Sequence, residues 1–211
     1  MNALLSHVLT LEKSPVGTTV RQRIREFSSF GNKSSQHWFS ELCFCILAAN
    51  AKGRVAYDIQ RALGVQGCCS ASRARVRKCI MSHKHRFHNN KTRFIIEARK
   101  HADIKGTVQS LVKKEGQALT REWLVKNIKG LGYKEASHFL RNVGYPDVAI
   151  IDRHVLNVLA ENRIIQKPKT LSPKTYLWIE AKLAKLAKQL HMRIGELDLY
   201  LWYMKAGEVL K

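Results

Sequence analysis

The feature that most constrains this chain is a pair of glycines set between two helical patterns, Gly130-Leu131-Gly132. Residues 120–128 before it have the composition of a short helix. After it, apolar residues recur at the i, i+3, i+4, i+7 spacing of a helix face, at Ala136, Phe139, Leu140 and Val143. Glycine lacks a Cβ, so such a turn can take positive φ and lie close to another backbone. The pattern predicts a helix-hairpin-helix over about residues 120–143.

This hairpin is suited to holding a phosphate. Its amides and the N-terminus of the second helix would point at an anion, where the helix dipole favours negative charge. Lys129 can add its charge to Gly130 and Gly132 at the same phosphate. A contact of this kind positions nucleic acid without reading its bases. An ordinary helical corner would show the same Gly-x-Gly pattern, and that reading stays open here.

Two polar residues near the hairpin are candidates for chemistry. Lys134 falls in the first turn of the second helix, where the positive dipole end favours a neutral, nucleophilic amine. Asp152 follows the apolar run 148–151 and opens another helix. Its carboxylate could accept the lysine's proton or stabilise a cationic sugar. Aspartate is also a favoured N-cap residue, and capping is compatible with catalysis.

The charge of the chain indicates an anionic partner. Among 211 residues, 37 are Lys or Arg and 16 are Asp or Glu, a net charge of +21. A protein this basic most often binds nucleic acid, although a solvated cationic surface is the plainer alternative. The segment from Ser70 to Lys100 sets ten basic residues against the single acid Glu97, and its loop 85–90 places Phe87 among polar residues. Apolar residues punctuate the segment, so we expect it to be folded.

Several classes of protein are disfavoured. The five cysteines form no C-x-x-C pair, and the histidines have no metal-ligand spacing with them, so we expect no metal site. We expect reduced thiols, with Cys43 and Cys45 in the core. Residues 1–20 do not have the pattern of a signal peptide, and no segment has the roughly 20 apolar residues that cross a bilayer.

We predict an all-α fold of two helical lobes with a DNA-binding cleft between them. Residues 1–50 with 168–211 would form a discontinuous lobe from both termini, and residues 51–167 the central lobe carrying the hairpin and Asp152. No strand pattern is convincing. The helices expected are Leu4–Leu11, Arg21–Phe30, the buried 38–50, Val55–Leu63 ending at Gly64, Thr107–Lys114, Thr120–Ile128 capped by Thr120, Tyr133–Val143, one opened by Asp152, one after Ser172-Pro173, and Glu196–Lys205.

The hairpin Gly130–Lys134 and the run Val148–Val155 resemble the helix-hairpin-helix DNA glycosylase superfamily, with its Gly/Pro-rich loop and aspartate. The finer resemblance is to the archaeal type 2 8-oxoguanine DNA glycosylases. It extends over Glu41–Leu47, His85–Phe87, Asn127–Val155 and Leu197–Tyr203 to the final Lys211, whereas residues 1–20 and 64–80 match poorly. Several separate motifs in the right order make the resemblance specific.

The resemblance implies a bifunctional glycosylase and abasic-site lyase. The damaged nucleotide would be flipped out of the duplex, because its sugar carbon cannot be reached inside the stack. Lys134 would attack that carbon, expel 8-oxoguanine and form a Schiff base, and β-elimination would nick the strand. Asp152 would assist by proton handling and electrostatic stabilisation.

The resemblance also implies the base pocket. The flipped base would lie between Phe87 and Trp202, and the carboxylate end of Lys211 would help to recognise the lesion. Asn50 would fill the hole left by the base, although a helix C-cap explains an Asn there equally well. Trp202 could likewise be a core residue. Arg86 and His154 are further candidates for DNA contacts, and His154 could instead pack within the protein.

The implied partner is double-stranded DNA containing 8-oxoguanine, bound by a monomer in the cytoplasm at the nucleoid. No organic cofactor is expected, and the hairpin carbonyls could bind a monovalent cation. Two alternatives stay open. One is the same chemistry on an oxidised pyrimidine or a bare abasic site. The other is a non-catalytic helix-hairpin-helix protein, in which Lys134 only contacts phosphate.

Overall fold

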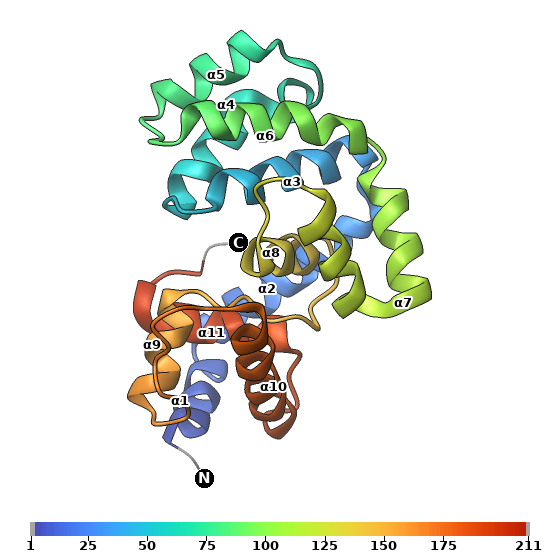
Figure 1. The fold of residues 1–211 in the computed structure, drawn as a ribbon. Coiled ribbons are helices and arrows are strands. Elements are labelled where there is room, and N and C mark those ends of the chain that lie inside the picture. Colours follow the sequence, from blue (N-terminus) through green and yellow to red (C-terminus); the bar gives the residue numbers. More distant parts are fainter. Residues whose placement is uncertain (1–2, 210–211) are drawn as a thin grey trace. The chain divides into compact units, whose positions relative to one another are not determined.

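The computed structural model describes residues 3–209, and every regular element in that range is helical (Figure 1), which confirms the all-α prediction. The elements are α1 (Ala3–Glu12), α2 (Pro15–Ser29), η1 (Phe30–Asn32), α3 (Ser35–Ala48), α4 (Gly53–Ser70), α5 (Arg73–Ser82), α6 (His88–Ala98), η2 (Arg99–His101), α7 (Ile104–Asn127), α8 (Tyr133–Asn142), α9 (Arg153–Glu161), α10 (Pro173–Gln189) and α11 (Ile194–Ala206). None of the helices in the described range is long and apolar enough to cross a membrane.

The chain divides into two compact units. The central unit is Asn32–Phe139, and the terminal unit combines Met1–Gly31 with Leu140–Lys211. These boundaries differ from the 50/51 and 167/168 divisions expected from the sequence. The difference arises because α3 packs on α4, α6 and α7, and so belongs to the central unit, while α9 packs on α11 in the terminal unit.

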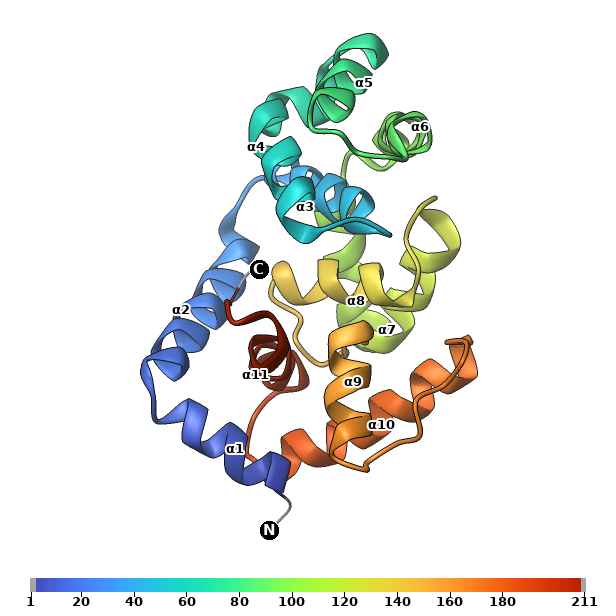
Figure 2. The same cartoon turned by 90° about the vertical axis from the view of Figure 1, so that its left-hand side faces the viewer.

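Helix α3 is the core of the central unit. Every residue from Trp38 to Ala48 is buried, as the apolar pattern predicted. Helices α4, α6 and α7 pack on α3, and α5 packs on α4 and α6 (Figures 1 and 2). Cys43 and Cys45 are buried in this helix and form no disulfide, as expected. The side chains of Trp38 and Phe139 meet edge to face, with ring centroids 6.2 Å apart, and so join α3 to α8.

Helix α11 has the corresponding place in the terminal unit. Residues Leu197 to Leu201 are buried, and α1, α2, α9 and α10 all pack on this helix. One buried residue, Asp198, carries a charge partner: its Oδ2 lies 2.6 Å from Nη1 of Arg141. Burial raises the pKa of Asp198 to about 7, with Arg141 opposing that rise and Asp152 adding to it. An apolar-looking helix therefore contains a titratable group.

Three expectations about helix ends were wrong. Helix α2 begins at Pro15, six residues earlier than expected, because Ser14 caps it by accepting from the N–H of Val16. Residues after Gly64 return to helix, so α4 continues to Ser70 beyond a bend at φ 65°. Thr120 does not cap a helix: it lies inside α7, where its hydroxyl donates to the carbonyl of Gly116, and the break comes at Gly116 itself.

Candidate functional site

The hairpin is confirmed as a backbone feature at the predicted place. Helix α7 ends at Asn127, Ile128 and Leu131 are buried, and α8 begins at Tyr133. Gly130 has φ +89°, and a Cβ built there would lie 2.6 Å from the ring of Phe94. Glycine is therefore required at position 130 both by the backbone angle and by the aromatic side chain packed against it.

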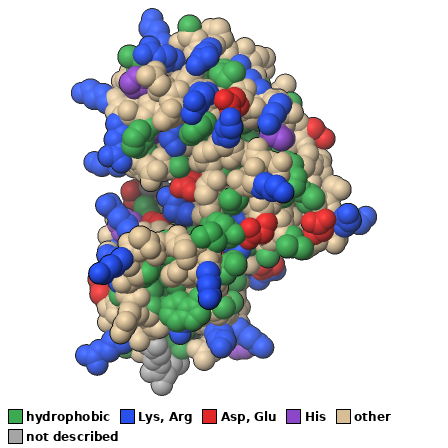
Figure 3. All heavy atoms as spheres, viewed as in Figure 1, with side chains coloured by type: hydrophobic (Ala, Val, Ile, Leu, Met, Phe, Trp, Pro, Cys, Tyr) green, Lys and Arg blue, Asp and Glu red, His purple; other side chains and the backbone are tan. Residues whose placement is uncertain are grey.

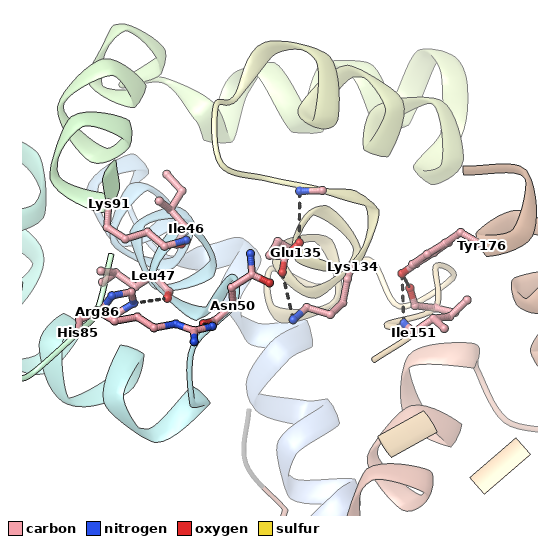
Figure 4. Close-up of polar contacts among 12 residues, drawn as sticks. Ile46, Leu47, Asn50, His85, Arg86, Lys91, Lys134, Glu135, Ile151 and Tyr176 are labelled. Atoms are coloured by element: carbon pink, nitrogen blue, oxygen red, sulfur yellow. Dashed lines mark hydrogen bonds and ion pairs between the residues drawn. The ribbon is translucent and has the colours of Figure 1, made fainter. Parts of the chain in front are cut away.

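Lys134 lies in the first turn of α8, beside a carboxylate. The carbonyl of Gly132 accepts the first helical hydrogen bond, from the N–H of Ala136, which makes Gly132 the N-cap. Lys134 Nζ lies 3.0 Å from Glu135 Oε1, and its side chain is 31% exposed (Figure 4). The amine of Lys134 is therefore partly accessible from solvent, and its ion pair with Glu135 fixes its position.

The hairpin amides are not all available to a phosphate. The N–H of Gly132 donates to Glu135 Oε2 at 3.2 Å, and that of Leu131 donates to the carbonyl of Ile128 at 3.3 Å. A phosphate that bound the Gly132 amide would have to displace the Glu135 side chain. Lys129 is better placed to contact a phosphate, because its side chain is 69% exposed and its ammonium forms an ion pair with Glu97 at 3.1 Å.

Phe87 stands at the surface on a turn that is fixed by His85. The imidazole Nε2 of buried His85 donates to the carbonyl of Leu47 at 3.0 Å, and its Nδ1 accepts the N–H of Phe87 at 3.2 Å. Burial lowers the pKa of His85, in keeping with this neutral tautomer. Phe87 is 37% exposed, and the Arg86 guanidinium lies over its ring at 4.6 Å from the centroid. A large aromatic face is thus presented on a rigid turn.

Three basic side chains cap the C-terminal end of α3, where helix carbonyls lack partners of their own. Lys91 Nζ donates to Ile46 O at 2.7 Å, His85 to Leu47 O, and Arg86 Nη2 to Asn50 O at 3.3 Å (Figure 4). The Lys91 cation is favoured at this negative end of the helix dipole, whereas His85 donates as a neutral imidazole. Asn50 itself is exposed and has φ 58°, the left-handed conformation that Asn tolerates after a helix.

Asp152 is the N-cap of α9 in the terminal unit. Its Oδ1 accepts the N–H groups of His154 and Val155 at 2.8 and 2.9 Å. The segment before it is fixed by buried Tyr176, whose hydroxyl donates to Ala149 O and accepts from Ile151 N–H (Figure 4). The carboxylate is therefore rigidly held and half-buried, as its capping role predicted.

Trp202 and His154 lie against each other in the terminal unit. Their rings meet edge to face with centroids 6.1 Å apart, and both side chains are half-buried. Trp202 is thus not enclosed in the core, and part of its surface stays accessible. Lys211 lies outside the residues that the structure describes, so its role stays a prediction.

Positive charge covers the outer helices of the central unit. Figure 3 shows Lys and Arg side chains projecting over α4, α5 and α6. Eight of the ten basic residues between 70 and 100 are exposed, and they are Arg73, Arg75, Arg77, Lys78, Lys84, Arg86, Arg93 and Lys100. Arg99 is half-buried, and Lys91 is buried. A polyanion would meet a concentrated positive field here.

The structure thus assigns the sequence-predicted residues to two units. Within the central unit, Lys129, Gly130, Gly132 and Lys134 share one hairpin, and Asn50 is joined to Arg86 and Phe87. The terminal unit holds Asp152, His154 and Trp202. No group of three or more His, Cys, Asp or Glu side chains that could hold a metal occurs in the described part of the chain.

The residues that sequence reasoning missed are Glu135, Lys91 and His85. Glu135 could have been found, because a Glu three residues after an N-cap is the second half of a capping box. Lys91 and His85 carried no such signal, since their partners are backbone carbonyls more than 35 positions away.

A hairpin with a half-exposed lysine, a rigid capping aspartate and a presented aromatic is consistent with DNA base-excision chemistry. A family model described as 8-oxoguanine DNA glycosylase matches residues 20–192, which is most of the chain. The chain belongs to this family. The 8-oxoguanine DNA glycosylase/AP lyase of Methanocaldococcus jannaschii is 46% identical over 209 residues, 99% of each chain. That of Korarchaeum cryptofilum is 42% identical, over 99% of this chain and 98% of the relative.

Solved structures of the same family share the fold. The crystal structure of the Methanocaldococcus jannaschii 8-oxoguanine glycosylase/lyase, in complex with a 15mer DNA containing 8-oxoguanine, matches with a TM-score of 0.94 at 45% identity, covering 99% of both chains. The Thermotoga maritima 8-oxoguanine DNA glycosylase matches with a TM-score of 0.89 at 36% identity, covering 99% of this chain and 98% of that one. The fold and the family predicted from the motifs are confirmed.

Proposed function

We propose that this chain excises 8-oxoguanine from double-stranded DNA and then cleaves the strand at the resulting abasic site. The observation that carries the proposal is the accessible Lys134 amine at the start of the helix after the Gly130–Gly132 hairpin. The relatives that match the whole chain are named for both activities, which supports the same pair of reactions here. The activity would be base-excision repair in the cytoplasm, at the nucleoid, by a monomer.

Lys134 would act as the nucleophile. Its neutral amine would attack C1′ of the flipped nucleotide as the bond from C1′ to the base breaks, and the departing base would take up a proton while the amine loses one. Opening of the sugar ring, with protonation of its oxygen, would leave a Schiff base between Lys134 and C1′. Removal of a C2′ proton would then break the bond to the 3′ phosphate, and water would release the lysine.

Asp152 would handle these protons and stabilise positive charge on the sugar. Its two N-cap hydrogen bonds keep the carboxylate in one orientation, which is what a preorganised electrostatic group requires. Asp152→Asn would retain the cap and remove the charge, so the variant separates catalysis from stability.

Phe87 and Trp202 would stack on the flipped base, and Lys211 would help to recognise the lesion. Stacking of a base on an aromatic side chain contributes about 1–3 kcal/mol. The accessible rings of Phe87 and Trp202 support these assignments. Lys129, Gly130 and the exposed Arg86 would contact phosphates, with Gly132, Asn50 and His154 as further DNA contacts. No cofactor is required, and a monovalent cation at the hairpin carbonyls would be structural.

Borohydride trapping tests the proposal. Reduction of the Schiff base would join the protein covalently to an 8-oxoguanine duplex, and Lys134→Gln is expected to abolish the adduct while DNA binding persists. Lys129→Gln is the matched control on the same hairpin, and it should still form the adduct while binding DNA more weakly. Its affinity should also depend less on salt, with a slope smaller by about 0.9, because one phosphate fewer is neutralised.

Three results would overturn the assignment in different ways. If no substrate gave an adduct, the result would indicate a non-catalytic DNA-binding protein. An adduct with oxidised pyrimidines or abasic sites, but no release of 8-oxoguanine, would change the lesion and keep the chemistry. An adduct in Lys134→Gln that disappears in Lys129→Gln would move the nucleophile to Lys129.

A further inference from the structure

The carboxylate of Glu135 links the hairpin backbone to the Lys134 amine. Its Oε2 accepts the N–H of Gly132 at 3.2 Å, and its Oε1 lies 3.0 Å from Lys134 Nζ (Figure 4). The side chain of Glu135 is only 11% exposed, so water screens this pair less than an ordinary surface ion pair. The position of the amine is therefore coupled to the geometry of the turn.

Two other lysines of the central unit have different partners. Lys91, from α6, is buried, with Nζ donating to Ile46 O at 2.7 Å, and burial lowers its pKa to about 8. The Lys129 ammonium is paired with Glu97 at 3.1 Å. Glu135 forms its ion pair with Lys134.

We propose that Glu135 is a positioning residue for Lys134. The inference rests on the proposed function, in which Lys134 must be neutral when it attacks. A carboxylate 3.0 Å away orients the amine but favours the ammonium form. The amine is thereby kept in place beside the turn.

The competing explanation is that Glu135 only caps α8. A capping role predicts a loss of stability when Glu135 is replaced, and no change in the reactivity of Lys134. Glu135→Gln separates the two roles, since the amide oxygen can still accept from Gly132 N–H while the charge is gone.

The test needs no DNA. The intact protein is labelled with trinitrobenzenesulfonate across a range of pH, and labelling of each lysine is followed by peptide mass spectrometry. Only the neutral amine reacts, so the midpoint of labelling reports proton loss. The midpoint of Lys134 is expected to fall by about half a pH unit in Glu135→Gln. Glu97→Gln is the matched control, and should leave the Lys134 midpoint in place.

An unchanged or higher midpoint in Glu135→Gln would overturn the inference. Single-turnover Schiff-base formation at an abasic site adds the catalytic readout: in Glu135→Gln its acid limb should move to lower pH while the plateau rate falls. If the wild type forms no Schiff base, the proposed function fails, whereas the labelling result on Glu135 still stands.

Discussion

Replacement of Gly130 by alanine should destabilise the central unit more than replacement of any nearby glycine. The backbone at this position has φ +89°, which costs a residue with a Cβ about 1–2 kcal/mol. The added Cβ would also lie 2.6 Å from the Phe94 ring, and relief of such a clash by repacking costs about 1–3 kcal/mol. The reduced freedom of the unfolded chain returns about 0.4–1 kcal/mol. The net loss is roughly 2–4 kcal/mol.

Two control glycines in the same unit separate these contributions. Gly116 has φ +82°, and a Cβ added there would meet no atom of the described residues within 4 Å, so Gly116→Ala bears only the backbone cost. Gly132 does not have positive φ, and its Cβ would meet the mobile end of Glu135 at 3.2 Å, so Gly132→Ala should lose less than about 1 kcal/mol. Gly130→Ala is therefore expected to destabilise the unit most, Gly116→Ala less, and Gly132→Ala least.

Urea unfolding measures the order directly. With a slope of about 2 kcal/mol per molar urea, Gly130→Ala should lower the midpoint by about 1–2 M. Replacement of Phe94 by alanine in that background should recover the steric part of the loss, which a double-mutant cycle reports as a coupling of at least about 1 kcal/mol. If Gly130→Ala is no worse than Gly116→Ala, the ring of Phe94 does not constrain the turn, and the steric explanation for Gly130 is refuted.

The other predictions concern single side chains. Asp152→Ala should lose about 1 kcal/mol with its cap while Asp152→Asn stays close to the wild type, and both should lose strand cleavage, as unfolding and trapping assays would show. Phe87→Ala should slow release of 8-oxoguanine by about tenfold or more and leave cleavage of a preformed abasic site less affected, a contrast that equal losses would disprove. Burial raises the pKa of Asp198 from 3.8 to about 7, so its contribution to stability is full below about pH 4 and is lost as pH rises through 7. Asp198→Asn should flatten this dependence in urea unfolding between about pH 4 and pH 7.

The hairpin and the helices beside it were predictable because their determinants are local. The spacing of Ala136, Phe139, Leu140 and Val143 defines one helix face, and all four are buried. The positive φ of Gly130 follows from the two glycines between helical patterns. The bend at Gly116 lies between the two separate helices expected there, but the helix resumes directly after it and Thr120 is not a cap.

The division into units was not predictable in the same way. The sequence shows that residues 38–48 form a buried helix, but periodicity does not say which other helices bury it. Helix α3 packs on α4, α6 and α7, so the division falls before α3 and not after it. Likewise α9 was grouped with the hairpin because it follows it in the chain, whereas it packs on α11.

The basic segment shows the same limit for charge. Arg73 and Lys91 look alike in a run of cations, yet Arg73 is exposed and Lys91 is buried on a carbonyl of α3. Net charge predicts a polyanionic partner for the whole surface, but it does not show which cations form contacts within the fold. Only tertiary contacts sort Lys91 and His85 from the residues available to DNA.

The start of α8 shows why Glu135, which the sequence analysis did not single out, is important for Lys134. A lysine in a first helical turn is disfavoured by the dipole, whereas a glutamate there is favoured. Lys134 and Glu135 are adjacent in that turn, and the carboxylate contacts both the amine and the Gly132 amide. The glutamate thus offsets the unfavourable placement of Lys134 at the positive end of the helix. If Lys134 is the nucleophile, as proposed, the carboxylate that holds it is supplied by the third residue after the N-cap.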